Sequence, residues 1–385
     1  MEYFLTEQQQ TLKGLARKIA EQRILPVRAE LDEKEEFPWD LIKEMAASDL
    51  LRIFIPEEYE GLGGGSLDLC LVIEELSRVC GGVAISYGAN ALGALPLIGY
   101  GSDEQKKKYL PDVASGRRLT AFAVTESTAG SDAANMRTTA TRAGGHYVLN
   151  GTKQFITNAG EAGIYSVVVM TDPARGARGA SALIVEKGTP GFTFGKKEKK
   201  MGIRTSSTRE LVFRDCRVPE ENVIGREGQG FIIAIRTLDR SRPGVAAQAV
   251  GIAQGALEAS VGYARQRVQF GHPISAIQAV QHLLADMATE LEAARALVYA
   301  TARTIDAGAK SFSEEAAMAK VFASDMAMRV TTNAVQILGG AGYMRDYPVE
   351  KMMRDAKVTQ IYEGTNQVVR NTIALEVLKR KALRE

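Results

Sequence analysis

A carboxylate near the C-terminus lies in a setting that suits proton transfer. Residues 360–367 read Q-I-Y-E-G-T-N-Q, so Glu363 lies between an apolar Ile-Tyr pair and the flexible Gly364. Burial would raise the pKa of this carboxylate and make it a better general base near neutral pH. From these residues alone, a surface glutamate at the start of the last helix is the safer interpretation.

Residues 123–132, A-V-T-E-S-T-A-G-S-D, form a second candidate, a β-like run that ends in small and hydroxyl side chains. Small residues let backbone amides approach a ligand closely. An ordinary turn has the same composition, so both interpretations stay open for this stretch.

A third candidate begins at Gln336, where a helical pattern ends in the glycine cluster Q-I-L-G-G-A-G-Y. Asp346, Lys351 and Asp355 follow the cluster. A glycine C-cap explains these glycines without any ligand.

Three blocks of different hydrophobic period must position these residues. From residue 6 to about 116 apolar residues recur at intervals of three and four, which predicts helices, and Thr6 and Gln9 form a capping box. From residue 119 to about 213 the period changes to two, which predicts an antiparallel sheet with a hairpin turn at Asn150-Gly151. The expected strands are 121–124, 146–149, 167–170, 182–185 and 210–213. Long helices, whose lengths favour a bundle, are expected over 230–265, 275–307, 313–336 and 368 to the end.

Composition narrows the class of protein. The chain of 385 residues is long enough for two or three units of ordinary domain size. Its 48 Lys and Arg against 46 Asp and Glu give a net charge of +2, which argues against a nucleic-acid-binding surface. With 45% hydrophobic and 24% charged residues, a packed, water-soluble protein is expected.

Several site classes have no support in the sequence. The three cysteines, Cys70, Cys80 and Cys216, are scattered, and the three histidines do not pair at metal-ligand spacing, so we expect no disulfide framework and no metal site. The patterns of a serine hydrolase elbow, a zinc protease, a P-loop and a Rossmann dinucleotide loop are missing from the sequence.

The N-terminal residues lack the basic start and apolar core of a signal peptide. We also expect no uncharged stretch long enough to cross a bilayer. A cytoplasmic protein without a membrane span is therefore predicted.

In their order and spacing, the three stretches together resemble the acyl-CoA dehydrogenase family, and the resemblance covers essentially the whole chain. The first matches the family's Thr/Ser-Glu, two residues, a small residue and Gly-Ser-Asp at Thr125, Glu126 and residues 129–132. Residues 336–355 match its Gln-x-x-Gly-Gly-x-Gly followed by an aromatic, an acid, a base and an acid. Between them, R-V-Q-F-G at 267–271 and Gln278 match a helix junction of the family and its following glutamine.

The resemblance implies an α+β fold: an N-terminal all-α domain over residues 1–118, a middle antiparallel β-barrel-like domain over 119–228, and a C-terminal four-helix bundle over 229–385. It also implies FAD between the last two domains and an oligomer, usually a homotetramer.

The family pattern places FAD against particular positions of this chain. The isoalloxazine and pyrophosphate contacts would come from Val124, Thr125, Gly130, Ser131, Phe155 and Thr157, with Thr157 near flavin N5. Adenosine and pyrophosphate contacts across a subunit interface would come from Arg267, Phe270, Gln278, Gln336, Gly339 and Gly340. Thr365 and Gln367 would approach the cofactor after the base.

The reaction that the resemblance implies is an α,β-dehydrogenation. Glu363, in the matching Y-E-G-T, would remove the pro-R α-proton of an acyl-CoA while the β-hydrogen leaves as hydride to flavin N5. An isovaleryl-type branch of the family carries its base on the bundle helix, immediately before the arginine that matches Arg242, but this chain has Ser241 there. Glu363 is therefore the matching candidate.

The resemblance also implies contacts with the substrate. Arg242 and Asp239 look like contacts on the CoA side, helped by Ser131, and Gly364 would let thioester and flavin pack closely. A structural ion pair remains the alternative for Arg242.

Three positions depart from the family pattern. Ser127-Thr128 replaces the common Pro-x, Asn135 replaces a smaller residue, and Phe155 replaces tryptophan. Because phenylalanine keeps an aromatic plane, we expect Phe155 to tune the flavin without loss of binding.

Mixed cues bear on the acyl group. Residues 81–93 contain no charge, which disfavours a dicarboxylic substrate. I-S-Y-G-A at 85–89 resembles the isovaleryl branch, whereas residues 196–204 and Glu363 resemble the short-chain branch. We predict a short, branched or cyclic acyl group.

Electrons would pass to an electron-transfer flavoprotein. A same-fold acyl-CoA oxidase or flavin monooxygenase is the enzymatic alternative. A non-enzymatic, DNA-associated relative is the other, and the near-zero net charge and the intact Glu363 argue against it.

Overall fold

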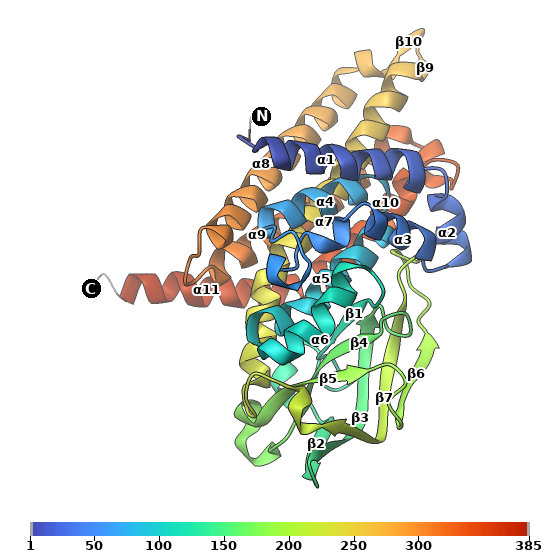
Figure 1. The fold of residues 1–385 in the computed structure, drawn as a ribbon. Helices are drawn as coiled ribbons and strands as arrows, with labels where there is room; N and C mark the ends of the chain where they lie inside the picture. The colour runs from blue at the N-terminus through green and yellow to red at the C-terminus, as the bar shows by residue number, and fades with distance from the viewer. Residues whose placement is uncertain (1–2, 383–385) are drawn as a thin grey trace.

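The computed structural model describes residues 3–382 and arranges them in three successive parts (Figure 1). The first part is helical, as the sequence predicts, and Thr6 and Gln9 form the expected capping box at its start. The helices are α1 (Glu7–Ile19), α2 (Arg28–Lys34), α3 (Trp39–Ala47), α4 (Ser66–Val79), α5 (Gly81–Tyr100) and α6 (Asp103–Ala114).

The second part is a sheet of eight strands in the order β6-β7-β3-β2-β4-β5-β8, with β1 beside β4. The strands are β1 (Thr120–Ala123), β2 (Thr139–Ala143), β3 (His146–Thr157), β4 (Ile164–Met170), β5 (Ala180–Glu186), β6 (Phe192–Lys197), β7 (Thr208–Pro219) and β8 (Val223–Ile224). Most pairs are antiparallel, but β1 pairs with β4 in parallel, because the β2–β3 hairpin lies between them in the chain and acts as a crossover. Strand β2 also pairs with β4 in parallel, at Thr139 and Met170, so the sheet is mixed where a fully antiparallel one was expected.

The predicted hairpin at Asn150-Gly151 is wrong. Strand β3 runs through both residues, and the turn lies earlier, at Gly144-Gly145, where both glycines have positive φ. Two such residues are what a two-residue hairpin turn requires. Gly151 instead lies at a register shift against β7, where a Cβ would approach the Cα of Thr138 to 2.7 Å.

The third part contains the expected long helices. They are α7 (Gly230–Gln266), α8 (Gln278–Asp306), α9 (Ser313–Leu338) and α11 (Asn366–Ala382), with the shorter α10 (Val349–Lys357) between the last two. Helix α8 begins three residues later than predicted, because residues 274–276 form a separate 3₁₀ turn. A small hairpin of β9 (Val268–Gln269) and β10 (His272–Pro273) caps the far end of α7 and α8, and α11 extends away on another side (Figure 1).

The expectation that no uncharged stretch is long enough to cross a bilayer is also wrong. Helix α5 has 20 residues without a charge, and its length and composition fit a membrane span. In the structure, 72% of its most apolar window is buried, and α5 contacts α4, α7, β1 and β4. It therefore packs as a core helix.

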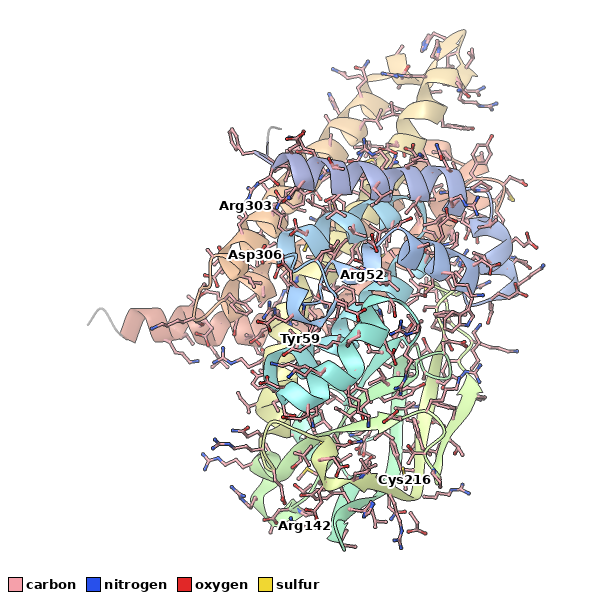
Figure 2. The ribbon with its side chains drawn as sticks, viewed as in Figure 1. Arg52, Tyr59, Arg142, Cys216, Arg303 and Asp306 are labelled. Atoms are coloured by element: carbon pink, nitrogen blue, oxygen red, sulfur yellow. The ribbon has the colours of Figure 1, made fainter. Side chains whose placement is uncertain are left out.

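The glycine run before α4 has a structural purpose. The backbone N–H groups of Ser66 and Leu67, at the start of α4, donate to the carboxylate of Asp306 at 2.6 and 2.9 Å. A Cβ on Gly65 would lie 2.5 Å from this carboxylate, so only glycine admits the contact. Asp306 is the last residue of α8, and Figure 2 marks it beside the first turn of α4. The contact ties the N-terminal part to the C-terminal part.

We predict that Asp306→Ala lowers the free energy of unfolding by about 1–2 kcal/mol, because two N–H groups at a helix N-terminus lose their charged acceptor. Urea unfolding of the variant and the wild type measures this. Asp306→Asn keeps one acceptor oxygen and should lose less. An Asp306→Ala protein as stable as the wild type would show that water replaces the carboxylate at no cost.

Candidate active site

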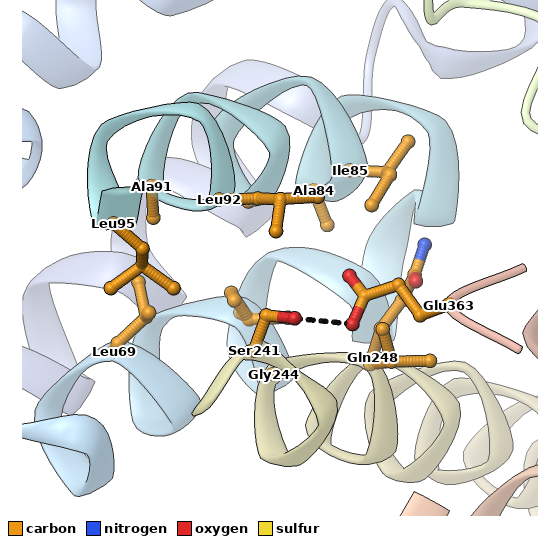
Figure 3. Close-up of a pocket in the computed structure, with 13 residues that line it drawn as sticks. Leu69, Ala84, Ile85, Ala91, Leu92, Leu95, Ser241, Gly244, Gln248 and Glu363 are labelled. Atoms are coloured by element: carbon orange, nitrogen blue, oxygen red, sulfur yellow. Dashed lines mark hydrogen bonds between the residues drawn. The ribbon is translucent and has the colours of Figure 1, made fainter. Parts of the chain in front are cut away.

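A narrow cavity lies between α4, α5 and α7, with Glu363 at one end (Figure 3). Its cavity volume is about 20 Å³, or about 370 Å³ when the open solvent around its mouth is counted, and its lining is mostly apolar. Helix α5 forms one wall with a single face, because its lining residues recur at helical spacing. They are Ala84, Ile85, Gly88, Ala91, Leu92 and Leu95.

Glu363 is held in place as a carboxylate in an apolar setting. The hydroxyl of Ser241, on α7, donates to its Oε2 at 2.5 Å, and the Nε of Arg242 donates to its backbone carbonyl at 3.4 Å. Burial raises the pKa of Glu363 to about 6, although the Ser241 hydrogen bond and the charges of Arg242 and Lys320 act in the opposite direction. A group with this pKa is ionised at neutral pH and can accept a proton.

The loop that carries Glu363 has an uncommon backbone. Glu363 and Gly364 have φ values of 52° and 94°, both in the region that favours glycine. The hydroxyl of Tyr362 donates to Gln248 on α7, and the Gln248 amide donates to the carbonyl of Gly81 at 3.0 Å. Through Gln248, Tyr362 is therefore connected to the N-terminus of α5.

Arg242 and Asp239 bind each other. Arg242 Nη1 lies 2.6 Å from Asp239 Oδ1, both side chains are buried, and the hydroxyl of Ser313 donates to Asp239 Oδ2 at 2.5 Å. This geometry is that of a structural ion pair, the alternative that the sequence left open for Arg242, and the pair lies beside Glu363.

A second group of predicted residues meets where β1 ends beside β3. The carbonyls of Val124 and Thr125 accept from Lys153 Nζ at 2.9 Å and from Gln154 N at 2.8 Å. On β3, Phe155 is 59% exposed, and Thr157 is the last residue of the strand. Gly130 and Ser131 are exposed in the loop after β1, and a Cβ on Gly130 would touch nothing within 4 Å.

Sequence reasoning missed Lys153. It is fully buried and lies 2.8 Å from Glu126, whose carboxylate also accepts the backbone N–H groups of Arg137 and Thr138. Burial acts to raise the pKa of Glu126, but the charge of Lys153 and the hydrogen bonds from Lys153, Thr138 and Arg137 lower it overall. The strand pattern could have predicted this ion pair, because a lysine at an inward position of a period-two strand needs a buried partner.

A third group lies away from the second within one chain. Arg267, Phe270 and Gln278 are exposed around the β9–β10 hairpin, at the far end of the bundle from the sheet (Figure 1). Gln336, Gly339 and Gly340 are exposed at the end of α9. Thr365 and Gln367 flank Asn366 at the start of α11, just after the base. One chain therefore does not bring all the predicted cofactor residues together.

Comparison with protein families covers the chain in three consecutive segments. Residues 6–117, 121–216 and 228–378 match the models of the acyl-CoA dehydrogenase N-terminal, middle and C-terminal domains.

Individual proteins are similar over the full length. The short-chain-specific acyl-CoA dehydrogenase of Megasphaera elsdenii is 50% identical over 96% of this chain and 97% of its own. The structure of butyryl-CoA dehydrogenase from the same organism has a TM-score of 0.96 at 48% identity, covering 98% of this chain and 100% of its own.

Two further structures are similar. A chain from a study of the electron transferring flavoprotein of Acidaminococcus fermentans has a TM-score of 0.96 at 52% identity, covering 98% of this chain and 100% of its own. An acyl-CoA dehydrogenase from Bacillus anthracis complexed with FAD has a TM-score of 0.93 at 36% identity, covering 99% of this chain and 68% of its own.

The raised pKa of Glu363 predicts a stability cost. Because its pKa rises from 4.5 unfolded to about 6 folded, stability falls as pH increases through this range and is lower by about 1–2 kcal/mol above pH 6. Glu363→Gln should therefore be more stable than the wild type at pH 7.5 and equally stable at pH 4. Urea unfolding at both pH values measures the difference, with the exposed Glu58→Gln as control. A difference that does not change with pH would contradict the assignment.

Proposed function

The chain belongs to the acyl-CoA dehydrogenase family of oxidoreductases, and on that premise we propose that it oxidises a short, branched or cyclic acyl-CoA to the 2-enoyl-CoA with FAD. The observation that carries this proposal is the carboxylate of Glu363, with a pKa of about 6, at the end of an apolar cavity. An α-proton of a thioester needs such a base close to it, out of water.

Glu363 takes the α-proton from the substrate. Because Ser241 engages Oε2, we assign the transfer to Oε1. The backbone N–H of Glu363 donates to the thioester carbonyl and stabilises the charge that develops on it. Gly364, without a side chain, leaves room for the thioester beside the base. Bound FAD supplies the acceptor for the β-hydrogen, which leaves as hydride.

Residues at the β1–β3 junction fit a flat aromatic cofactor. Phe155 offers an exposed ring on a strand, Thr157 offers a hydroxyl at its end, and the open space at Gly130 admits a ligand close to the backbone. With Val124, Thr125 and Ser131 they would hold FAD on one face.

A second copy of the chain completes this site in our proposal. Phe270, on the β9–β10 loop, is 90% exposed, which is unusual for a large apolar side chain. The groups at this hairpin and at the end of α9 would contact the adenosine and pyrophosphate of FAD across an interface. Thr365 and Gln367 would approach the cofactor just after Glu363. We propose that the protein is a homotetramer. Within each chain we place the domain boundaries after residues 118 and 228. We also propose that an electron-transfer flavoprotein accepts the electrons.

The cavity favours a small apolar acyl group. Its polar side chains are Ser241, Gln248 and Glu363, and the Gln248 amide is already committed to Gly81 and Tyr362. No lining side chain carries a positive charge for a second carboxylate. Gly88 leaves space in the cavity, because a Cβ there would project towards the lining residues Ile73 and Ile85, at 3.5 and 3.9 Å.

The CoA phosphates need cations, and Arg242 is already paired with Asp239. A surface groove beside the cavity offers three exposed ones, Arg236, Arg240 and Lys310. Leu95 lines both the groove and the cavity, so apolar and basic surfaces adjoin. We propose that the phosphates bind in this groove.

The first test is substrate-driven bleaching of FAD absorbance. Profiled over C4 to C16, branched and cyclic acyl-CoAs, the enzyme should prefer short, branched or cyclic substrates, and Glu363→Gln should keep FAD bound but abolish bleaching. A preference for C14 or longer would contradict the acyl assignment, and bleaching by Glu363→Gln near the wild-type rate would contradict the assignment of Glu363 as the base.

Rapid reoxidation of the reduced, product-bound flavin by air would favour an oxidase or monooxygenase. DNA binding in a gel-shift at physiological salt would favour the DNA-associated relative.

The second test asks whether the CoA phosphates bind in the basic groove. Arg240→Glu should raise KM for the acyl-CoA roughly five- to tenfold with little change in kcat, and less so at high salt, because it reverses a charge near the phosphates. The matching acyl-pantetheine, which has no phosphate, should show no change. Arg214→Glu, exposed on β7, is the control. Equal effects on both substrates would place the phosphates elsewhere.

A further inference from the structure

We propose that Lys320 is a positioning residue for Glu363: its ammonium group fixes the loop of the base and favours the carboxylate form of Glu363. This inference rests on the proposed function, in which Glu363 is the base. It concerns a residue of α9 that none of the sequence motifs includes.

Lys320 contacts the backbone directly after the base. It lies in the middle of α9 and is fully buried. Its Nζ donates to the carbonyl of Gly364 at 2.7 Å and to Oδ1 of Asn366 at 2.8 Å. These two hydrogen bonds hold the loop from α9, whereas Ser241 and Arg242 hold it from α7, so two helices fix the loop of the base.

Asn366 extends this clamp along α9. Its amide donates to the hydroxyl of Ser324 at 2.9 Å and to Asp325 Oδ1 at 2.8 Å. Because both partners lie on the helix that carries Lys320, the start of α11 is fixed to α9 at three points. The left-handed backbone at Glu363 and Gly364 is sparsely populated in free chains and persists only with such support.

The charge of Lys320 complements that of Glu363. Burial lowers the pKa of Lys320 to about 8, and Glu363 is the carboxylate that counteracts this most strongly. The other charges facing the ammonium come from Arg242 on α7, Asp325 on α9 and Arg370 on α11. Two of these charges have partners of their own. Asp325 Oδ2 lies 2.5 Å from Arg370 Nη2, and Arg242 is paired with Asp239.

This arrangement acts on the proton that the reaction moves. When Glu363 accepts the α-proton its charge disappears, and Lys320 loses its main counter-charge. Lys320 therefore favours release of that proton once the product has left, and it keeps more of the resting enzyme in the reactive carboxylate form.

The experiment uses FAD-loaded protein with Lys320→Met and Lys320→Gln. Both remove the charge, and Gln keeps a neutral donor, so it remains informative if the Met variant folds poorly. The acid limb of substrate-driven flavin reduction, measured against pH, should move upward by on the order of one pH unit in both variants. Lys320→Arg, which keeps the charge, should restore the wild-type limb, and the exposed Lys199→Met is the control.

A second readout needs no turnover. In the resting enzyme, infrared difference spectra report the protonated carboxyl of Glu363, identified by its loss in Glu363→Gln, and its titration should move in the same direction. An unchanged acid limb and titration in both neutral variants would overturn the role of Lys320. Wild-type protein that no acyl-CoA reduces, or full activity of Glu363→Gln, would instead overturn the proposed function and the inference with it.

Discussion

Desolvation of one carboxylate is the constraint on which the site depends. In the proposed reaction Glu363 must be shielded from water to act as a base near neutral pH, yet a buried charge without compensation is costly. Ser241, Arg242 and Lys320 supply that compensation from two helices, and the loop accepts two left-handed residues to reach them. The packing of α7 against α9 therefore fixes the surroundings of this carboxylate.

Helix α5 both packs in the core and lines the cavity. Its lack of charge lets it pack against β1 and β4 on one side, while its opposite face lines the cavity. At its C-terminal end the surface changes from apolar to basic within a few residues, around Leu95. A ligand with an apolar end and an anionic end is thus oriented by the polarity of the surface before any specific hydrogen bond forms.

Sequence patterns that are periodic or confined to neighbouring residues were sufficient to predict much of this structure. The helices, the sheet block, the Thr6 capping box and the family motifs could all be predicted, because each depends on neighbours in sequence. The position of the hairpin turn could not be predicted, because Gly144-Gly145 and Asn150-Gly151 both suit a hairpin. The pairing of β3 with β7 continues through Asn150-Gly151 and leaves the turn at Gly144-Gly145. Lys320 carried no local signal, because its partner Gly364 lies 44 residues away.

Contacts at long range also set the order in which the chain can fold. The N-terminus of α4 finds its charged acceptor in Asp306, 240 residues later. During synthesis the N–H groups of Ser66 and Leu67 therefore lack this acceptor until residue 306 has been made, although Asp68 can already accept from Gly65. The first turn of α4 thus reaches its full set of hydrogen bonds only when the end of α8 is in place.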